Sequence, residues 1–178
     1  KHGVSALHIA IINDRTNLAL KLLEHPNISD SINHLNKHGR TPLITAIDLN
    51  MPKLALKLLE HPSISKSIHQ TDRNGVTPLL AAIVTKQTDV ALKLLEHPNI
   101  SDSINQAEKT GRITPLLAAI RSKQTDIVLA LLKRKDIGPS INQANKQEHP
   151  FIIALRQRNN NVVNQLLTHT LRIPFSHT

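Results

Sequence analysis

Histidine is the residue type in this chain with the most obvious capacity for chemistry, and the sequence holds 11 of them. An imidazole can bind a transition metal or transfer a proton near neutral pH. His25, His61 and His97 recur at intervals of 36 residues, each before a proline. Elements repeated at that interval would hold them on the order of 10 Å apart, whereas zinc needs its nitrogen ligands at about 2.0–2.1 Å. We therefore expect no metal site, and expect these histidines to bond the last carbonyls of a helix.

Motifs for catalysis or cofactor binding are missing from the sequence. It contains no Gly-rich phosphate loop, no nucleophile elbow and no His-Glu-x-x-His motif. Serine, histidine and aspartate are frequent, but no spacing pairs a nucleophile with a base. We expect no catalytic residue and no cofactor in this chain, so that any catalysis would lie outside it.

Charge is the remaining chemical signal. The formal net charge is +9, and residues 109–145 and 146–178 carry +5 and +3 of it. Such a field attracts acidic partners, although a solvated basic surface that merely keeps the protein in solution would have the same composition. Single-stranded nucleic acid is usually bound by basic grooves with stacking aromatics, and this chain has two Phe and no Trp or Tyr. Binding of nucleic acid or of an anionic membrane surface is therefore the third-ranked function.

The element that must position these residues is a repeat. Leu-Leu pairs begin at residues 22, 58, 94, 131 and 166, with spacings of 36, 36, 37 and 35 residues. Thr-Pro pairs begin at residues 41, 77 and 114 in the same phase. A period of this length is typical of a solenoid. We predict one array with repeats at about 1–36, 37–72, 73–108, 109–145 and 146–178.

Each repeat is predicted to form two helices. In the third repeat, Thr77 is a suitable N-cap and Pro78 suits the first helical position. Leu79, Ala82 and Ile83 then form one apolar stripe, and a second helix follows from Thr88. Its buried face is predicted to comprise Val90, Ala91, Leu94 and Leu95. His97-Pro98 should end it, because a residue before proline is driven out of the helical region. In the second repeat, Pro52 fixes the start of the second helix near Met51.

These residues match a known family. The pattern Gly-x-Thr-Pro-Leu-x-x-Ala, then Val-x-x-x-Leu-Leu-Glu-His, then Ile-Asn resembles the ankyrin repeat over essentially the whole chain. The matching positions in the third repeat are Gly75, Thr77, Pro78, Leu79, Ala82, Val90, Leu94, Leu95, Glu96, His97, Ile104 and Asn105. The resemblance implies an all-α solenoid of stacked helix-turn-helix units with hairpin loops. It also implies a structural role for His8, which would brace neighbouring loops through hydrogen bonds.

The repeat departs from the family in length, since ankyrin repeats usually have about 33 residues. The extra residues follow the second helix and contain isoleucines four apart: Ile28 and Ile32, Ile64 and Ile68, Ile100 and Ile104, Ile137 and Ile141. That spacing places both isoleucines on one side of a helical turn. We predict an extra ordered turn in each repeat; the alternative is an unstructured insert with chance isoleucines.

The resemblance also implies where a partner protein binds, namely the hairpin tips and the inner face of the first helices. At these places the copies differ from one another while the core positions agree. The predicted tip residues are Lys37, His38, Arg40, Arg73, Asn74, Val76, Lys109, Thr110 and Arg112. The predicted inner-face residues are Thr45, Asp48, Leu49, Ala81, Val84, Thr85, Ala118, Arg121 and Ser122. Sequence drift on a surface that contacts no partner would produce the same variation among the copies.

The leading functional hypothesis is a protein–protein interaction scaffold whose partner carries an acidic or mixed surface. The alternative is the targeting arm of a larger enzyme, because the Asn-, Lys- and Ile-rich repeats resemble those of secreted effectors of intracellular bacteria. We expect a monomer that works in the cytoplasm or, as an effector, in the cytoplasm or nucleus of a host cell. The chain has no Cys, which excludes disulfides, and does not begin with Met. We therefore expect it to be part of a longer protein.

Overall fold

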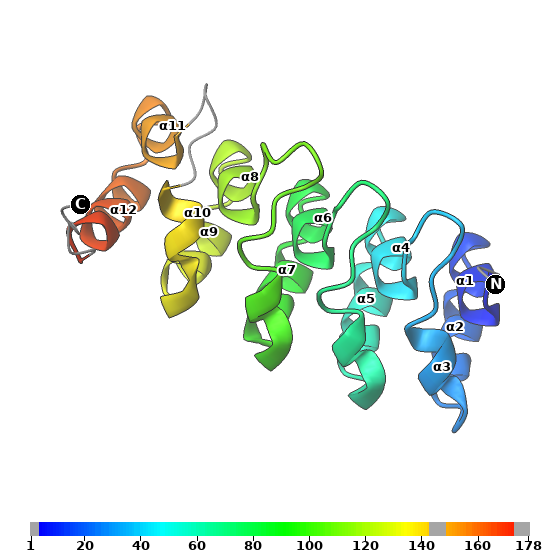
Figure 1. Cartoon of the computed structure of the whole chain (residues 1–178). Coiled ribbons are helices and arrows are strands. Elements are labelled where there is room, and N and C mark those ends of the chain that lie inside the picture. Colours follow the sequence, from blue (N-terminus) through cyan, green and yellow to red (C-terminus); the bar gives the residue numbers. More distant parts are fainter. Residues whose placement is uncertain (1–3, 143–148, 173–178) are drawn as a thin grey trace.

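The computed structural model describes residues 4–142 and 149–172, and these residues contain helices and no β-strand. The fold is an all-α solenoid, in which successive helical hairpins pack side by side (Figure 1). The first helices are α1 (Ala6–Ile12), α4 (Pro42–Asp48), α6 (Pro78–Val84), α8 (Pro115–Arg121) and α11 (Pro150–Arg156). The second helices are α2 (Thr16–Leu23), α5 (Pro52–Leu59), α7 (Thr88–Glu96), α9 (Thr125–Leu132) and α12 (Asn160–Arg172). Each first helix contacts its own second helix, and neighbouring first helices contact one another along the stack.

The first helices begin where the sequence predicts, because their N-caps satisfy backbone N–H groups that no helical carbonyl can reach. The Thr77 hydroxyl accepts from the backbone N–H of Leu80 at 3.1 Å, and Pro78 occupies the first turn. Thr41 and Thr114 cap α4 and α8 in the same way. At the two degenerate copies, Ser5 and His149 supply the cap with their own side chains.

The core is a continuous aliphatic cluster that runs through all the hairpins. In the third repeat, all the predicted core residues of both helices are buried, with Leu95 7% exposed and the others 0% exposed. The Leu and Ala side chains of one hairpin pack against those of the next, so no hairpin buries its apolar face alone. The predicted helix start at Pro52 is also confirmed, with Met51 at the N-cap.

A short helical turn follows each of the first four second helices, as the isoleucine spacing predicts. These turns are α3 (Ile28–Ile32), η1 (Pro62–Lys66), η2 (Pro98–Asp102) and η3 (Lys135–Ile137), the last continued by α10 (Gly138–Asn142); the η elements are 3₁₀ helices. Every isoleucine of the four pairs is at most 6% exposed. The extra residues of the repeat therefore add apolar contacts to the stack.

The histidines before these turns have a different role from the predicted one. The Nδ1 atoms of His25, His61 and His97 each accept a hydrogen bond from the backbone N–H two residues later, at 3.2 Å. The imidazoles therefore do not make the predicted bond to the last carbonyls of the preceding helix; the backbone N–H groups of these histidines make it, donating to the carbonyls of Leu22, Leu58 and Leu94. His61 and His97 have extended backbone conformations, with ψ of 131° and 133°, which turn the imidazole towards the free N–H groups of the following turn. His61 and His97 thus cap the starts of η1 and η2, whereas His25 bonds to Asn27, the residue before α3.

Candidate binding surface

The hairpin tips are held in shape by one side-chain acceptor and one glycine per repeat. Asp72 Oδ1 accepts from the backbone N–H groups of Asn74 and Val76, at 2.8 and 3.0 Å. Asn36 and Glu108 make the same pair of bonds in their own hairpins. Gly39, Gly75 and Gly111 have positive φ angles of 74°, 76° and 70°, a region that residues with a Cβ atom seldom adopt. The tip backbone is therefore fixed before any partner binds.

Neighbouring tips are joined through their backbones. The N–H of Arg73 donates to the carbonyl of His38 at 3.1 Å, and the N–H of Lys109 donates to the carbonyl of Asn74 at 2.8 Å. These bonds set the register of consecutive hairpins along one edge of the molecule (Figure 1). The tip side chains consequently follow one another in a fixed order.

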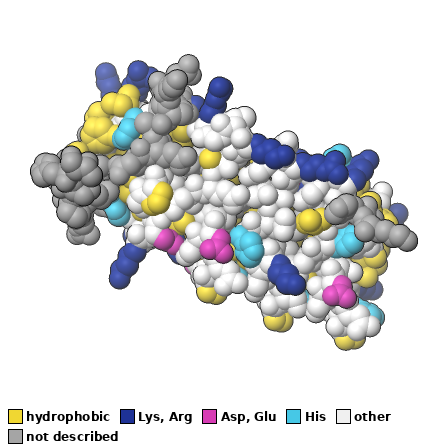
Figure 2. Space-filling model, viewed as in Figure 1, with side chains coloured by type: hydrophobic (Ala, Val, Ile, Leu, Met, Phe, Trp, Pro, Cys, Tyr) yellow, Lys and Arg dark blue, Asp and Glu magenta, His cyan; other side chains and the backbone are white. Residues whose placement is uncertain are grey.

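Most of the predicted tip residues are open to solvent. The exposed ones are Lys37, His38, Arg73, Asn74, Lys109, Thr110 and Arg112, whereas Arg40 and Val76 are half-buried. In the space-filling view, Lys and Arg side chains form a row along this edge, and the acidic side chains visible there lie on the other half of the face (Figure 2). The edge therefore has a basic character.

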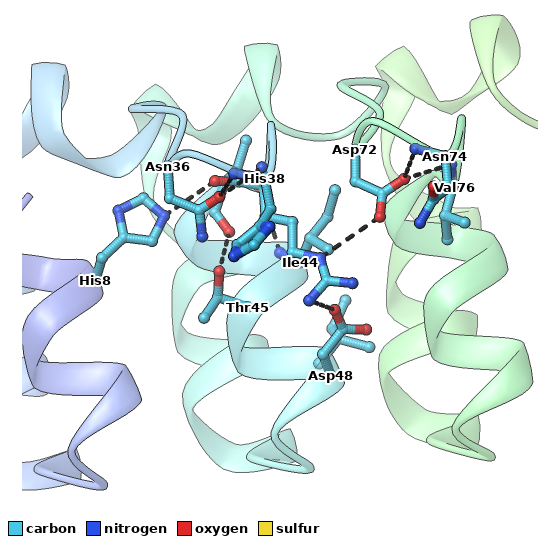
Figure 3. A network of polar contacts seen from close by, with 12 residues as sticks. His8, Asn36, His38, Ile44, Thr45, Asp48, Asp72, Asn74 and Val76 are labelled. Atoms are coloured by element: carbon cyan, nitrogen blue, oxygen red, sulfur yellow. Dashed lines mark hydrogen bonds and ion pairs between the residues drawn. The ribbon is translucent and has the colours of Figure 1, made fainter. Parts of the chain in front are cut away.

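Arg40 differs from the other cations because it is bound to two carboxylates (Figure 3). Its Nη1 atom lies 3.1 Å from Asp48 Oδ2, and its Nε atom lies 3.5 Å from Asp72 Oδ2 in the next hairpin. The Asp72 side chain is only 4% exposed. Burial raises the pKa of Asp48, Arg40 opposes that rise, and Asp72 adds to it. Arg40 and Asp48 thus connect two repeats, which limits what they can offer a partner.

The predicted inner-face residues divide into three groups. Thr45, Ala81 and Ala118 are 6%, 3% and 7% exposed, because the neighbouring first helices pack over them. They have almost no surface that a partner could touch. Thr85 and Ser122 are half-buried, and their hydroxyls donate to the carbonyls of Ala81 and Ala118. The open inner face consists of the side chains of Asp48, Leu49, Val84 and Arg121.

Two residues that sequence reasoning missed tie the inner faces together. Gln87 Nε2 donates to the carbonyl of Ile47 at 2.6 Å, and Gln124 Nε2 donates to the carbonyl of Ile83 at 2.8 Å. Each glutamine thereby satisfies a carbonyl at the end of the preceding first helix. The available signal was that glutamine occupies the same position in the third and fourth repeats. Only the structure shows which carbonyl it reaches.

Metal-binding and membrane-spanning features can be checked over the part of the chain that the structure describes. In residues 4–142 and 149–172, no group of three His, Cys, Asp or Glu side chains is arranged to hold a metal ion. Within the same residues, no helix has the length and apolar character needed to cross a bilayer. The features that stand out are the fixed hairpin tips and the open inner face.

Stacked helical hairpins with such tips define a repeat solenoid, and comparison with known proteins identifies its class. The family described as ankyrin repeats (3 copies) matches residues 1–70 and 48–145. The chain therefore belongs to the ankyrin repeat family. Ankyrin repeats are in general protein–protein interaction modules, and domains built from them are typically binding scaffolds without catalysis.

Solved structures share this fold. The ankyrin repeat domain of Bcl-3, a member of the IkappaB protein family, is 22% identical with a TM-score of 0.71, over 95% of this chain and 73% of that chain. An ankyrin repeat domain from Acinetobacter baumannii AYE is 23% identical with a TM-score of 0.73, over 96% of this chain and 83% of that chain. At these identities the similarity shows the fold alone. No curated protein matches the sequence significantly.

Proposed function

We propose that this chain is a protein-binding module whose contact surface combines the hairpin tips with the open positions of the first helices. The observation that carries the proposal is the contrast between a fixed frame and a variable, exposed surface. Asp72 and its counterparts hold the backbone of each tip, while the adjacent Arg73 and Asn74 project into solvent. A rigid frame lowers the entropy that binding would otherwise cost.

The chemistry of this surface favours a partner with both acidic and apolar groups. Val84 and Leu49 are 63% and 49% exposed on the inner face, so this face offers aliphatic side chains to a partner. Arg121 lies on the same face, one repeat further along, and Arg73 lies at a tip. A protein segment that presents carboxylates beside aliphatic side chains would complement these residues.

The experiment is affinity capture with the purified chain, followed by direct titration of each captured protein. The test variant replaces Arg73, Arg112 and Arg121 together with alanine. These residues lie at two tips and on the inner face, so we expect the triple variant to lose the partner while its helical circular dichroism and unfolding midpoint stay close to those of the wild type. Binding of the wild type should persist at moderate salt, because apolar contacts contribute to it.

A matched control removes three cations elsewhere. Lys21, Lys66 and Lys133 are exposed residues of α2, of η1 and of the C-terminal end of α9, and replacing them with alanine gives the same change in net charge. This variant should bind as the wild type does. If the Arg73, Arg112 and Arg121 variant also bound normally, the proposed surface would be wrong.

A further inference from the structure

Three cations occupy the same place in consecutive hairpins, and together they form what we call the basic ridge: Lys37, Arg73 and Lys109. Each directly follows the side-chain acceptor of its hairpin and is 36 residues from the next. All three are exposed. Their side chains make no hydrogen bond or ion pair with any other residue that the structure describes. The ridge therefore presents three cations that the fold itself does not use.

The side-chain stems of Arg73 and Lys109 are positioned by the glycines of the preceding hairpins. A Cβ atom placed on Gly39 would lie 3.3 Å from Cγ of Arg73, and one placed on Gly75 would lie 3.3 Å from Cγ of Lys109. Each stem therefore passes over the glycine of the hairpin before it. Together with the backbone bonds between tips, this contact keeps the charged groups in a row along the edge (Figure 2).

Among the described residues, the carboxylates of the hairpins form no ion pair with the three cations of the ridge. Asp72 is buried and is bound to backbone N–H groups of its own tip and to Arg40. Glu108 accepts hydrogen bonds from Thr110 and from the backbone N–H of Arg112. Both carboxylates thus already have hydrogen-bond partners within this chain. A carboxylate of another molecule can therefore approach the ridge.

The spacing of the ridge favours one conformation for an extended acidic ligand. Packed helices lie about 8–10 Å apart, so successive cations are separated by about that distance. A polyproline II helix has three residues per turn and rises about 3.1 Å per residue, so its side chains at i, i+3 and i+6 share one side and repeat every 9 Å or so. In a β-strand, side chains three apart point to opposite faces. Of these two extended conformations, polyproline II is the one that keeps a carboxylate against each cation.

We propose that the basic ridge binds an extended, acidic protein segment in the polyproline II conformation, with Asp or Glu at every third residue. This inference rests on the proposed protein-binding function and adds the chemistry and conformation of the ligand. A protein ligand is favoured over nucleic acid, because a ridge of three cations neutralises few phosphates compared with the six to ten contacts of a typical DNA site. The chain also supplies only two Phe and no Trp or Tyr on which bases could stack.

The test uses two peptides of identical composition. In the phased peptide the triplet Glu-Pro-Pro is repeated so that three glutamates share one side; in the clustered peptide the same glutamates are contiguous. Each is titrated at low salt into the whole, isotopically labelled chain, and the amide resonances are followed by NMR. We expect the phased peptide to shift the amides of residues 36–40, 72–76 and 108–112 and to bind more tightly than the clustered one. Equal binding of the two peptides would overturn the proposal.

Charge reversal at the centre of the ridge supplies the second measurement. Arg73→Glu removes one ion pair and adds a repulsion, so we expect the affinity for the phased peptide to fall about tenfold. Lys66→Glu, in η1 on the far side of the helices from the tips, makes the same change in net charge and should leave the affinity unchanged. An equal loss of affinity in both variants would mean that the net charge of the chain, and not the ridge, attracts the peptide. That result would contradict the proposal. So would tighter binding of a single-stranded oligonucleotide at the same amides.

Failure of this inference can be told apart from failure of the proposed function. Arg73→Glu and Val84→Asp are each assayed against a captured partner protein. Loss of the partner in the Arg73→Glu variant supports the ridge as the binding site for an acidic segment. Loss only in the Val84→Asp variant would mean that the inner face binds the partner and the ridge does not. That result would support the protein-binding function and contradict the proposed role of the ridge.

Discussion

His8 shows how one side chain joins two repeats. Its ring is fully buried, with Nδ1 3.0 Å from the Ser5 hydroxyl and Nε2 3.0 Å from the carbonyl oxygen of Arg40. A carbonyl only accepts, so Nε2 carries the proton and Nδ1 of the neutral ring accepts from Ser5. The ankyrin resemblance predicts such a bracing role, and these two bonds confirm it. Burial lowers the pKa of His8, the bond to Arg40 opposes that shift, and the nearby His34 adds to it.

A pH dependence of stability follows from this lowered pKa. In the unfolded chain His8 takes up a proton near its ordinary value of about 6.5, whereas in the folded chain it resists protonation. The stabilisation from neutral His8 is therefore fully present above pH 6.5 or so, and is lost as the pH falls through the lowered folded value. We expect the free energy of unfolding, measured with urea between pH 8 and pH 5 or so, to decrease more steeply in the wild type than in His8→Gln. Equal slopes would show that His8 titrates alike in both states.

At the scale of the elements, the hairpin tips combine a conformational demand with a packing demand. Gly75 has a positive φ, and a Cβ atom on it would lie only 2.9 Å from the backbone nitrogen of Lys109 in the next hairpin. Gly111 has nearly the same φ of 70°, but a Cβ atom there would meet nothing within 4 Å. The two glycines therefore separate the cost of the left-handed backbone from the cost of crowding the neighbouring tip.

Alanine at these two positions should give different losses of stability. Gly111→Ala carries only the strain of a left-handed residue, about 1–2 kcal/mol. Gly75→Ala carries the same strain and also pushes Arg73 to Val76 away from Lys109, so we expect a loss about 1 kcal/mol or more greater. Urea unfolding of both variants measures the difference. Losses of equal size would mean that the contact between tips contributes nothing to stability.

Local features of the elements could be predicted from sequence, because the residues involved are close together in the chain. The Thr77 cap, the Pro52 helix start and the isoleucine turns all depend on groups fewer than five residues apart. The bond from Gln87 to Ile47 spans 40 residues, and the ion pair of Arg40 with Asp72 joins neighbouring hairpins. Which atoms meet there depends on the exact stacking of the repeats, and no local pattern encodes it.

The candidate surface was predictable only in outline for the same reason. Variation between copies correctly separates Val84 and Arg121 from the core, since both are exposed. It places Ala81 on the inner face as well, although stacking of the first helices buries this residue. Variation alone cannot distinguish a small residue that fits beneath a neighbour from one that faces a partner. Whether the exposed residues bind a protein stays a prediction.

At the scale of the whole molecule, burial at equivalent positions depends on having a preceding hairpin. Leu54, Val90, Ile127 and Val162 occupy the same position in successive second helices and are at most 2% exposed. Leu18 occupies that position in α2 and is 49% exposed. Ile9 likewise is 52% exposed, whereas its counterpart Ala81 is 3% exposed. The outer side of the first repeat therefore carries a stacking face that no residue in the described part of the chain covers.

Truncation of equivalent leucines tests this account of burial. Leu54→Ala leaves a cavity between two packed hairpins and should lower the free energy of unfolding by about 2–5 kcal/mol. Leu18→Ala removes a side chain that solvent already reaches, so we expect a loss of about 1 kcal/mol or less. Urea unfolding at low protein concentration compares them, because the two substitutions delete the same atoms at the same repeat position. A loss at Leu18 as large as that at Leu54 would mean that another surface covers Leu18 in solution, and a rise of that loss with protein concentration would identify that surface as a second copy of the chain.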